Sequence, residues 1–223
     1  MAGMAGWSHA QQVPKEVQNI IDNYTKDSSM DFGFNFVKKA YKLDKDLGLS
    51  DIKVGAQLEV YGFNYKLLDS CSDTVSIKKI IQPANIWYML IEAHGKYIYD
   101  IEIYKEKGKW VPCGLGKDVA HRLQDVMTER PHIFKTNPIL IEDAIRKYLY
   151  FPQSESHKLL YLNPLQKDSL EIAISNAGDS LVDSRLILNY RKKLYQQQKP
   201  KREEFLRNHP NFFKQENNSG GGE

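Results

Sequence analysis

The feature that most constrains the fold is a run of three β-forming segments separated by two glycine turns in the middle of the chain. Residues 87–93 are apolar and β-prone, and Gly95 lies in the interruption that follows them. Residues 97–104 alternate between apolar and polar positions, and Gly108 marks a second turn. Connections this short join antiparallel strands. The run therefore predicts a three-stranded meander over about residues 86–113.

The middle segment of this meander has one polar face. Asp100 and Glu102 lie on it, and Glu92 lies on the neighbouring strand. Paired carboxylates can perform acid–base chemistry or hold calcium, but beside lysines on an antiparallel sheet they usually form a solvated face. We therefore expect this face to meet water, with Tyr97 and Tyr99 together on the other face. Pro112 cannot donate to a central ladder and predicts the end of the third strand.

Aromatic side chains are concentrated in the meander. At strand spacing, such residues usually form the core and cross-strand pairs, and we favour this interpretation. The alternative is an aromatic ligand cleft. Its candidate binding residues are Trp87, Trp110, Tyr97 and Tyr99.

Helices are predicted on both sides of the meander in the chain. Residues 117–129 place apolar side chains on one stripe, which we expect to pack on the meander. Two amphipathic helices are predicted to begin near Pro14 and Ser28. A short helix at 170–176 and a final helix at about 183–197 are predicted near the C-terminus. The pattern predicts an α+β fold with an antiparallel sheet, two N-terminal helices and C-terminal helices.

Two regions around this framework are less regular. Gly55 and Gly62 predict a turn and a bulge in a strand before the meander. Residues 147–151 and 158–162 are β-prone and predict a hairpin. The spacing of residues 139–146 also fits the start of a helix, so helix and strand both stay open there.

The 223 residues have an ordinary globular composition, which suits one large or two small domains. We expect a single domain over residues 13–199, with a sub-boundary near 131–137, and a polar, partly disordered tail over 200–223. No segment approaches the apolar length that spans a bilayer.

Residues 1–12 are unusual. Small and apolar residues lead into Ser8-His9-Ala10, a small-x-small ending typical of the last part of a secretory signal peptide. This pattern predicts a secreted or periplasmic protein. The alternative is a disordered N-terminus on a cytoplasmic protein.

Three sequence runs resemble known proteins. They are V-G-A-Q-L-E-V-Y-G-F (54–63), I-I-Q-P-A-N-I-W-Y-M-L-I (80–91) and G-K-W-V-P-C-G-L-G (108–116). Over roughly residues 50–165 the chain resembles uncharacterised secreted bacterial proteins. The resemblance implies export and a mixed α+β fold, and it brings no known activity or catalytic residue.

The chain has two cysteines, Cys71 and Cys113. In an oxidising compartment they could form a disulfide that closes a loop of about 43 residues, worth about 3–4 kcal/mol. Two free thiols are the alternative. Cys113 also precedes the predicted helix at 117–129, and His121 follows it in the sequence. A helix N-terminus lowers a thiol pKa and a histidine can act as base, so a thiol enzyme using Cys113 and His121 is an alternative function.

Other chemistries find little support. The six histidines lack metal-ligand spacing, and residues 114–117 lack the full phosphate-loop pattern, so we expect no metal and no cofactor. The net charge of +3 does not call for nucleic acid. Residues 191–202 are basic with one tyrosine, which favours a solvated helix end, and phosphate contact is the alternative.

The sequence thus predicts a secreted, non-enzymatic protein that binds an unknown protein or small ligand through a surface. A thiol enzyme and a nucleic-acid binder using residues 191–202 are the alternatives.

Overall fold

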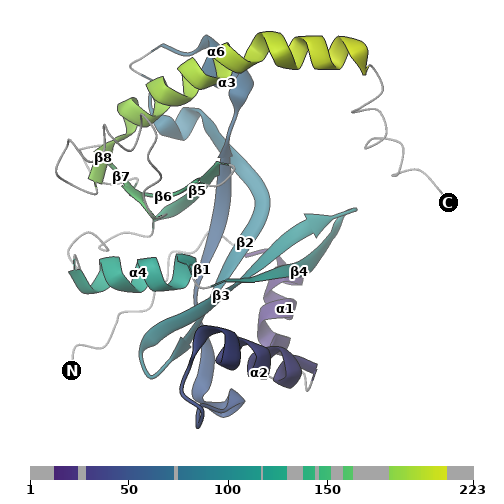
Figure 1. Ribbon diagram of the computed structural model, residues 1–223, viewed down its shortest axis with the longest axis vertical. Coiled ribbons are helices and arrows are strands. Elements are labelled where there is room, and N and C mark those ends of the chain that lie inside the picture. The colour runs from purple at the N-terminus through teal and green to yellow at the C-terminus, as the bar shows by residue number, and fades with distance from the viewer. Residues whose placement is uncertain are drawn as a thin grey trace.

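Eight strands form one mixed sheet, and helices cover both of its faces (Figure 1). The architecture is therefore α+β, as predicted. This computed structural model describes residues 13–24, 29–72, 75–116, 118–129, 138–143, 146–151, 158–162 and 181–209. The predicted leader at 1–12, the sub-boundary at 131–137 and the short helix at 170–176 lie outside the described residues.

The sheet consists of two antiparallel halves joined by one parallel pair, β1 with β5. In their order across the sheet, the strands are β4 (Lys109–Gly116), β3 (Lys96–Glu106), β2 (Ile81–Ala93), β1 (Ile52–Phe63), β5 (Ile139–Asp143), β6 (Arg146–Tyr150), β7 (Lys158–Tyr161) and β8 (Leu181–Asp183). The predicted meander is confirmed as β2–β3–β4, and the predicted hairpin is confirmed as β6–β7.

The helical alternative for residues 139–146 is wrong, because residues 139–143 form strand β5. Leu140 packs in the core on one face of the sheet and Ile141 in the core on the other. A strand buried on both faces has a continuous apolar sequence, which periodicity cannot distinguish from a buried helix.

The helices are α1 (Lys15–Tyr24), α2 (Ser29–Tyr41), α3 (Tyr65–Ser70), α4 (Asp118–Glu129) and α6 (Ser184–Asn208), with 3₁₀ turns at Leu49–Asp51 and Ile77–Lys79. The predicted helix at 117–129 is confirmed as α4, and its apolar stripe packs on the sheet. On the opposite face, α1 and α2 cover the β1–β4 half, while α3 and α6 cover the β5–β8 half. None of the helices in the described part of the chain has the length and apolar character needed to cross a bilayer.

The expected solvated face of β3 is covered by α4 at Asp100, which is only 3% exposed and accepts a hydrogen bond from Ala120 N, whereas Glu102 on the same face is partly exposed. The expected grouping of Tyr97 with Tyr99 is also wrong. A register shift after Ile91 puts Tyr97 into the core beneath α4, whereas Tyr99 lies in the core beneath α1 and α2. Such a bulge reverses the inside–outside alternation at one point of a strand.

Pro112 does not end its strand, because β4 continues to Gly116. β4 is an edge strand, where a missing N–H can face away from the ladder. The pairing shifts between Glu102 and Ile103, which leaves Cys113 as the extra residue of a bulge. Gly55 likewise forms no turn. It lies inside β1 at a register shift, and Gly62 lies beside a second one.

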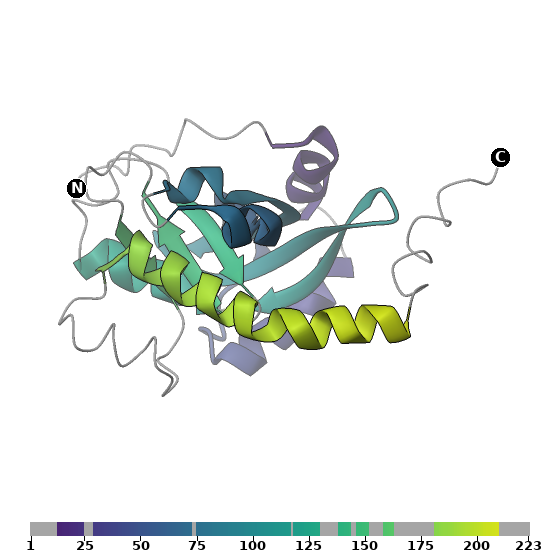
Figure 2. The same ribbon diagram turned by 90° about the horizontal axis from the view of Figure 1, so that it is seen from above.

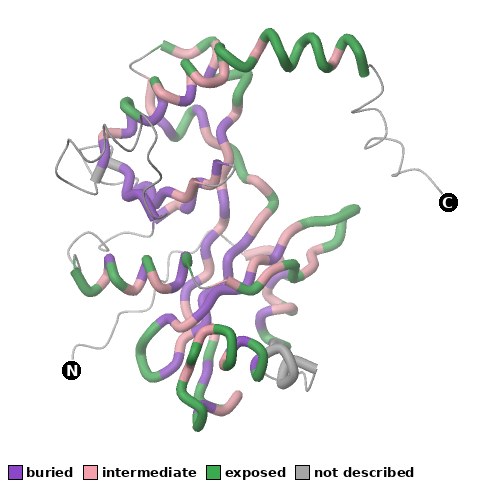
Figure 3. The backbone as a smooth tube through the Cα atoms, viewed as in Figure 1, coloured by how far each residue is buried: buried purple, intermediate pink, exposed green. Residues whose placement is uncertain are grey.

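Helix α6 is longer than predicted, since it continues through Pro200 to Asn208. Asp183 caps its start by accepting a hydrogen bond of 2.9 Å from Arg185 N. Both views show α6 bent midway (Figures 1 and 2). Proline inside a helix removes one backbone hydrogen bond and bends the helix. The first half packs on the sheet, and the second half extends beyond it and is mostly exposed (Figure 3).

Candidate functional site

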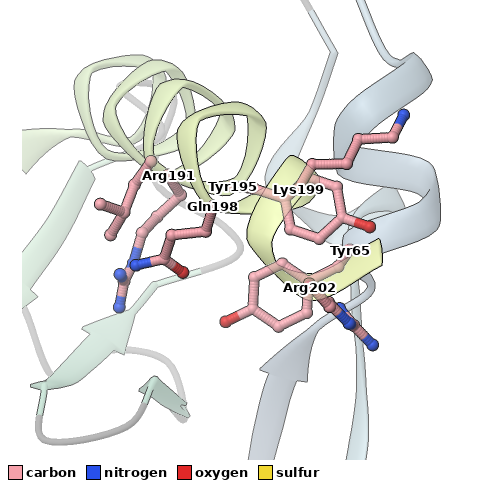
Figure 4. A pocket seen from close by; sticks show the side chains of 7 residues that line it. Tyr65, Arg191, Tyr195, Gln198, Lys199 and Arg202 are labelled. Atoms are coloured by element: carbon pink, nitrogen blue, oxygen red, sulfur yellow. The ribbon is translucent and has the colours of Figure 1, made fainter. Parts of the chain in front are cut away.

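A pocket of about 270 Å³ lies where α6 passes α3 (Figure 4). The short helix α3 begins directly after β1, and the Asn64 side chain caps it by accepting from Leu67 N at 3.2 Å. This cap places Tyr65 at the first position of α3, facing α6. The pocket is lined by Tyr65, Arg191, Leu194, Tyr195, Gln198, Lys199 and Arg202.

All the α6 residues of this pocket lie on one side of the helix. Relative to Arg191 they follow at i+3, i+4, i+7, i+8 and i+11, which is the repeat of one helical face. A single amphipathic face therefore supplies most of the lining, and the ring of Tyr65 closes the pocket from α3.

Arg191, one of the lining residues, forms a buried ion pair with Asp143, and the two side chains are 6% and 3% exposed. Tyr65 Oη donates to Asp143 Oδ1 at 2.9 Å, and Arg191 Nη2 donates to the Asp143 carbonyl at 3.3 Å. Burial lowers the pKa of Arg191, but an arginine keeps its charge in proteins. Among the described residues, Arg191 Nε–H has no hydrogen-bond acceptor. Beside the pocket there is thus a guanidinium whose charge is paired with Asp143 and whose buried Nε–H has no acceptor.

The rim of the pocket combines aromatic and cationic side chains. The rings of Tyr65 and Tyr195 stack with centroids 5.3 Å apart and an interplanar angle of 16°. Lys199 Nζ donates to Asp69 Oδ2 at 2.7 Å, and this contact raises the pKa of Lys199 and lowers that of Asp69. Arg202 is exposed and has no acidic partner in the described part of the chain.

The charge of α6 sets this site apart from the rest of the protein. The helix contains eight Lys or Arg residues and two Glu, a net charge of +6. Because the whole chain carries +3, the residues outside α6 carry a net −3. The pocket therefore lies on a strongly basic helix of an otherwise acidic chain.

A second polar cluster lies on the α4 side of the sheet. Tyr88 Oη lies 3.1 Å from Glu102 Oε2 and 3.4 Å from Glu142 Oε2, and Lys147 Nζ donates to Glu142 Oε1 at 2.7 Å. Burial raises the pKa of Tyr88, so the hydroxyl stays protonated. Neither of the two described pockets includes these residues.

Cys113 belongs to this second cluster. Burial and the nearby Glu102 raise the pKa of its thiol to about 11, which holds it in the unreactive protonated form. His121 Nε2 instead lies 3.1 Å from the Ile98 carbonyl, and among the described residues no hydrogen bond joins it to Cys113. Because Ile98 and Glu102 are four residues apart on β3, they are separated by about 13 Å.

Both predicted disulfide partners are free thiols in the structure. Cys113 is exposed on β4, and Cys71 Sγ donates to the Leu68 carbonyl at 3.2 Å. The possible Cys71–Cys113 bridge is therefore not seen, and the structure agrees with the alternative of two free thiols.

Three of the four aromatic candidates, Trp87, Tyr97 and Tyr99, are buried in the core. Trp110 alone is partly exposed, and Lys105 Nζ lies 5.5 Å from the centroid of its ring. No group of three or more His, Cys, Asp or Glu side chains in the described part of the chain could hold a metal ion.

Another pocket, of about 490 Å³, lies beside α2 and is lined by Asn35, Lys38, Lys39, Lys42, Leu43 and Lys45. The Lys38 ammonium already donates to the carbonyls of Lys45 and Leu47, at 2.7 Å each. The described lining contains no aromatic side chain, so the α3–α6 pocket is the better candidate site.

Sequence reasoning identified the basic segment 191–202 but missed the α3 side of this site. Tyr65 and Asp143 are 78 residues apart, so only tertiary structure brings them together. The helical spacing of Arg191, Tyr195 and Arg202 was the signal that could have revealed the α6 face. Comparison with protein-family models, curated proteins and solved structures found no match for the chain.

Proposed function

We propose that this protein is a non-enzymatic binding protein whose ligand site is the α3–α6 pocket and whose ligand carries a negatively charged group. The observation that carries the proposal is Arg191, a buried residue that lines the pocket and whose Nε–H has no acceptor in the described structure. An anionic oxygen would satisfy this donor, and charge-assisted hydrogen bonds of this kind are strong and directional.

The surrounding side chains support the same ligand chemistry. Arg202 adds an exposed guanidinium, and the stacked Tyr65 and Tyr195 offer an apolar surface beside the charge. By contrast, the thiol-enzyme alternative is weakened by the raised pKa of Cys113 and by its separation from His121.

Calorimetric titration with pyrophosphate and with citrate tests this proposal. Arg202→Gln is expected to weaken anion binding about tenfold, which corresponds to the loss of one charged hydrogen bond. Lys193→Gln is the matched control, because it removes the same charge from an exposed position on the other side of α6. Equal affinity in wild type, Arg202→Gln and Lys193→Gln would show that the pocket does not bind these anions.

We further infer that the protein acts outside the cytoplasm. The leader-like pattern of residues 1–12 supports this inference, and the resemblance of residues 50–165 points the same way. The intact mass of protein purified from its native host provides the test. A chain that begins at Gln11 is expected, and a chain that retains Met1 would contradict export.

A further inference from the structure

We propose that the pocket beside α2 is a second anion site, which binds a small soluble molecule that carries several phosphate groups and no aromatic base. The inference goes beyond the proposed function, because α2 and α6 lie at opposite ends of the longest axis of the molecule (Figure 1). The volume of about 490 Å³ lies in the range of small-molecule sites. The described lining consists of Asn35, Leu43 and four lysines, which are Lys38, Lys39, Lys42 and Lys45.

The lysines come together through the helical repeat and a reversal of the chain. Lys38, Lys39 and Lys42 follow Asn35 at i+3, i+4 and i+7, which is the spacing of one helical face. The chain then turns back, and Lys38 Nζ holds the returning segment by donating to the carbonyls of Lys45 and Leu47 at 2.7 Å each. Lys38 thus fixes the loop, and the loop brings Lys45 to the pocket.

Three of the four ammonium groups are available to a ligand. Lys39, Lys42 and Lys45 are exposed, and within the described part of the chain their side chains form no hydrogen bond or ion pair. The single acidic residue of segment 35–45 is Asp44, whose Oδ1 accepts from the backbone N–H of Asp46 at 3.0 Å. The pocket therefore concentrates positive charge, which attracts anions.

The dipole of α2 explains only part of this charge. Cations stabilise the last turn of a helix, which accounts for Lys38 and Lys39, whereas Lys42 and Lys45 lie beyond the end of α2. Lys42 also has a φ of 54°, the left-handed conformation that glycine usually provides after a helix. This conformation is unfavourable for a residue with a Cβ, and such backbone strain is concentrated at ligand sites.

The lining selects the class of anion. Lysine binds phosphate as a point charge and not through a rigid fork, so several lysines suit several phosphates close together. The described lining contains no aromatic ring on which a base could stack and no carboxylate that would repel the ligand. The amide of Asn35 adds both a donor and an acceptor. A short polyphosphate or a phosphorylated polyol fits these features, whereas a nucleotide gains nothing from its base.

Calorimetric titration of the full chain with tripolyphosphate at low salt, where screening is weak, tests the inference. Lys42→Gly removes one ammonium group and is expected to weaken binding about three- to tenfold. The urea midpoint of unfolding is expected to be retained, because glycine adopts the left-handed conformation without a steric cost. Lys39→Gln is expected to weaken binding to a similar extent.

Lys107→Gly is the matched control. Lys107 is exposed in the β3–β4 turn with a φ of 48°, so its replacement removes the same charge from the same kind of backbone conformation outside the pocket. This variant is expected to bind tripolyphosphate like wild type. Equal losses in Lys42→Gly and Lys107→Gly would reduce the effect to the net charge of the protein and would overturn the site.

The remaining outcomes separate this inference from the proposed function. A loss of tripolyphosphate affinity in Arg202→Gln but not in Lys42→Gly overturns this inference and leaves the α3–α6 site standing. A loss in Lys42→Gly that persists in the Arg202→Gln background supports the α2 pocket. ATP that binds more than about tenfold tighter than tripolyphosphate would overturn the assignment to a ligand without a base. Binding to phosphatidylinositol bisphosphate vesicles without binding to tripolyphosphate would overturn it in favour of a membrane surface.

Discussion

Asp100 and Gly116 face each other on β3 and β4, and the missing side chain of Gly116 provides the space that the Asp100 carboxylate occupies. A Cβ at Gly116 would overlap with Asp100 Oδ1. The other oxygen, Oδ2, accepts a hydrogen bond of 3.0 Å from Ala120 N in the first turn of α4. The pair thus joins the meander to α4, because the carboxylate satisfies an N–H that the helix itself leaves unpaired.

Gly116→Ala is therefore expected to destabilise the protein by about 1–3 kcal/mol, the usual cost of overpacking. The Asp100 carboxylate cannot move away without losing its hydrogen bond to Ala120. Urea unfolding measures the effect, and Gly114→Ala is the control, because a Cβ there would lie 3.9 Å from Glu102 Cβ. Equal unfolding free energies for the two variants would refute the steric argument.

The Asp100 carboxylate also predicts that the stability of the protein depends on pH. Burial raises its pKa from 3.8 to about 6, and the hydrogen bond from Ala120 N partly opposes this shift. Between pH 3.8 and about 6, Asp100 therefore keeps its proton in the folded state but has lost it in the unfolded state. The contribution of Asp100 to stability is complete below pH 3.8 and is lost as the pH rises through about 6.

Asp100→Asn removes this titration while keeping an oxygen that can accept from Ala120 N. The unfolding free energy of the variant minus that of wild type is expected to rise by up to about 3 kcal/mol from pH 4 to pH 7. This value follows because one pKa unit corresponds to about 1.36 kcal/mol. Urea unfolding of both proteins at the two pH values gives this difference. An identical difference between variant and wild type at both pH values would mean that Asp100 does not titrate in this window.

Much of the fold could be predicted from local sequence. Gly95 and Gly108 adopt positive φ in the two turns where they were expected, and the one strand between them, β3, follows the predicted alternation over most of its length. The errors share one cause. At Tyr97, Asp100 and Pro112, tertiary features that local periodicity does not contain decide the outcome: a bulge, a covering helix and an edge position.

The candidate site could be predicted only in part. The cationic residues of α6 are adjacent in the sequence, so composition identifies them. Tyr65 and Asp143 reach α6 only because the parallel pairing of β1 with β5 brings the ends of these strands together. Pro200 also led to the prediction of a polar tail where the helix in fact continues, because a bent helix tolerates an exposed proline.

Cys113 is predicted to be a slowly reacting thiol, because burial and Glu102 hold its pKa near 11. In a Cys71→Ser background, Glu102→Gln removes the adjacent negative charge and is expected to speed alkylation by iodoacetamide at pH 8 roughly two- to tenfold. Burial continues to raise the pKa, so the rate should stay below that of a free thiol. An unchanged alkylation rate would exclude Glu102 as a cause of the shift.

The Arg191–Asp143 pair predicts that removing one partner costs more than removing both. Arg191→Met leaves a buried carboxylate without its counter-ion and is expected to cost about 3–5 kcal/mol, whereas Arg191→Met with Asp143→Leu should recover part of that loss. Arg185→Ala is the control, since its pair with Asp183 is exposed and worth about 0–1 kcal/mol. Unfolding free energies from urea titration of Arg191→Met, Asp143→Leu and the double variant decide the question. If the loss in the double variant equals the sum of the losses in the two single variants, the two charges are not coupled.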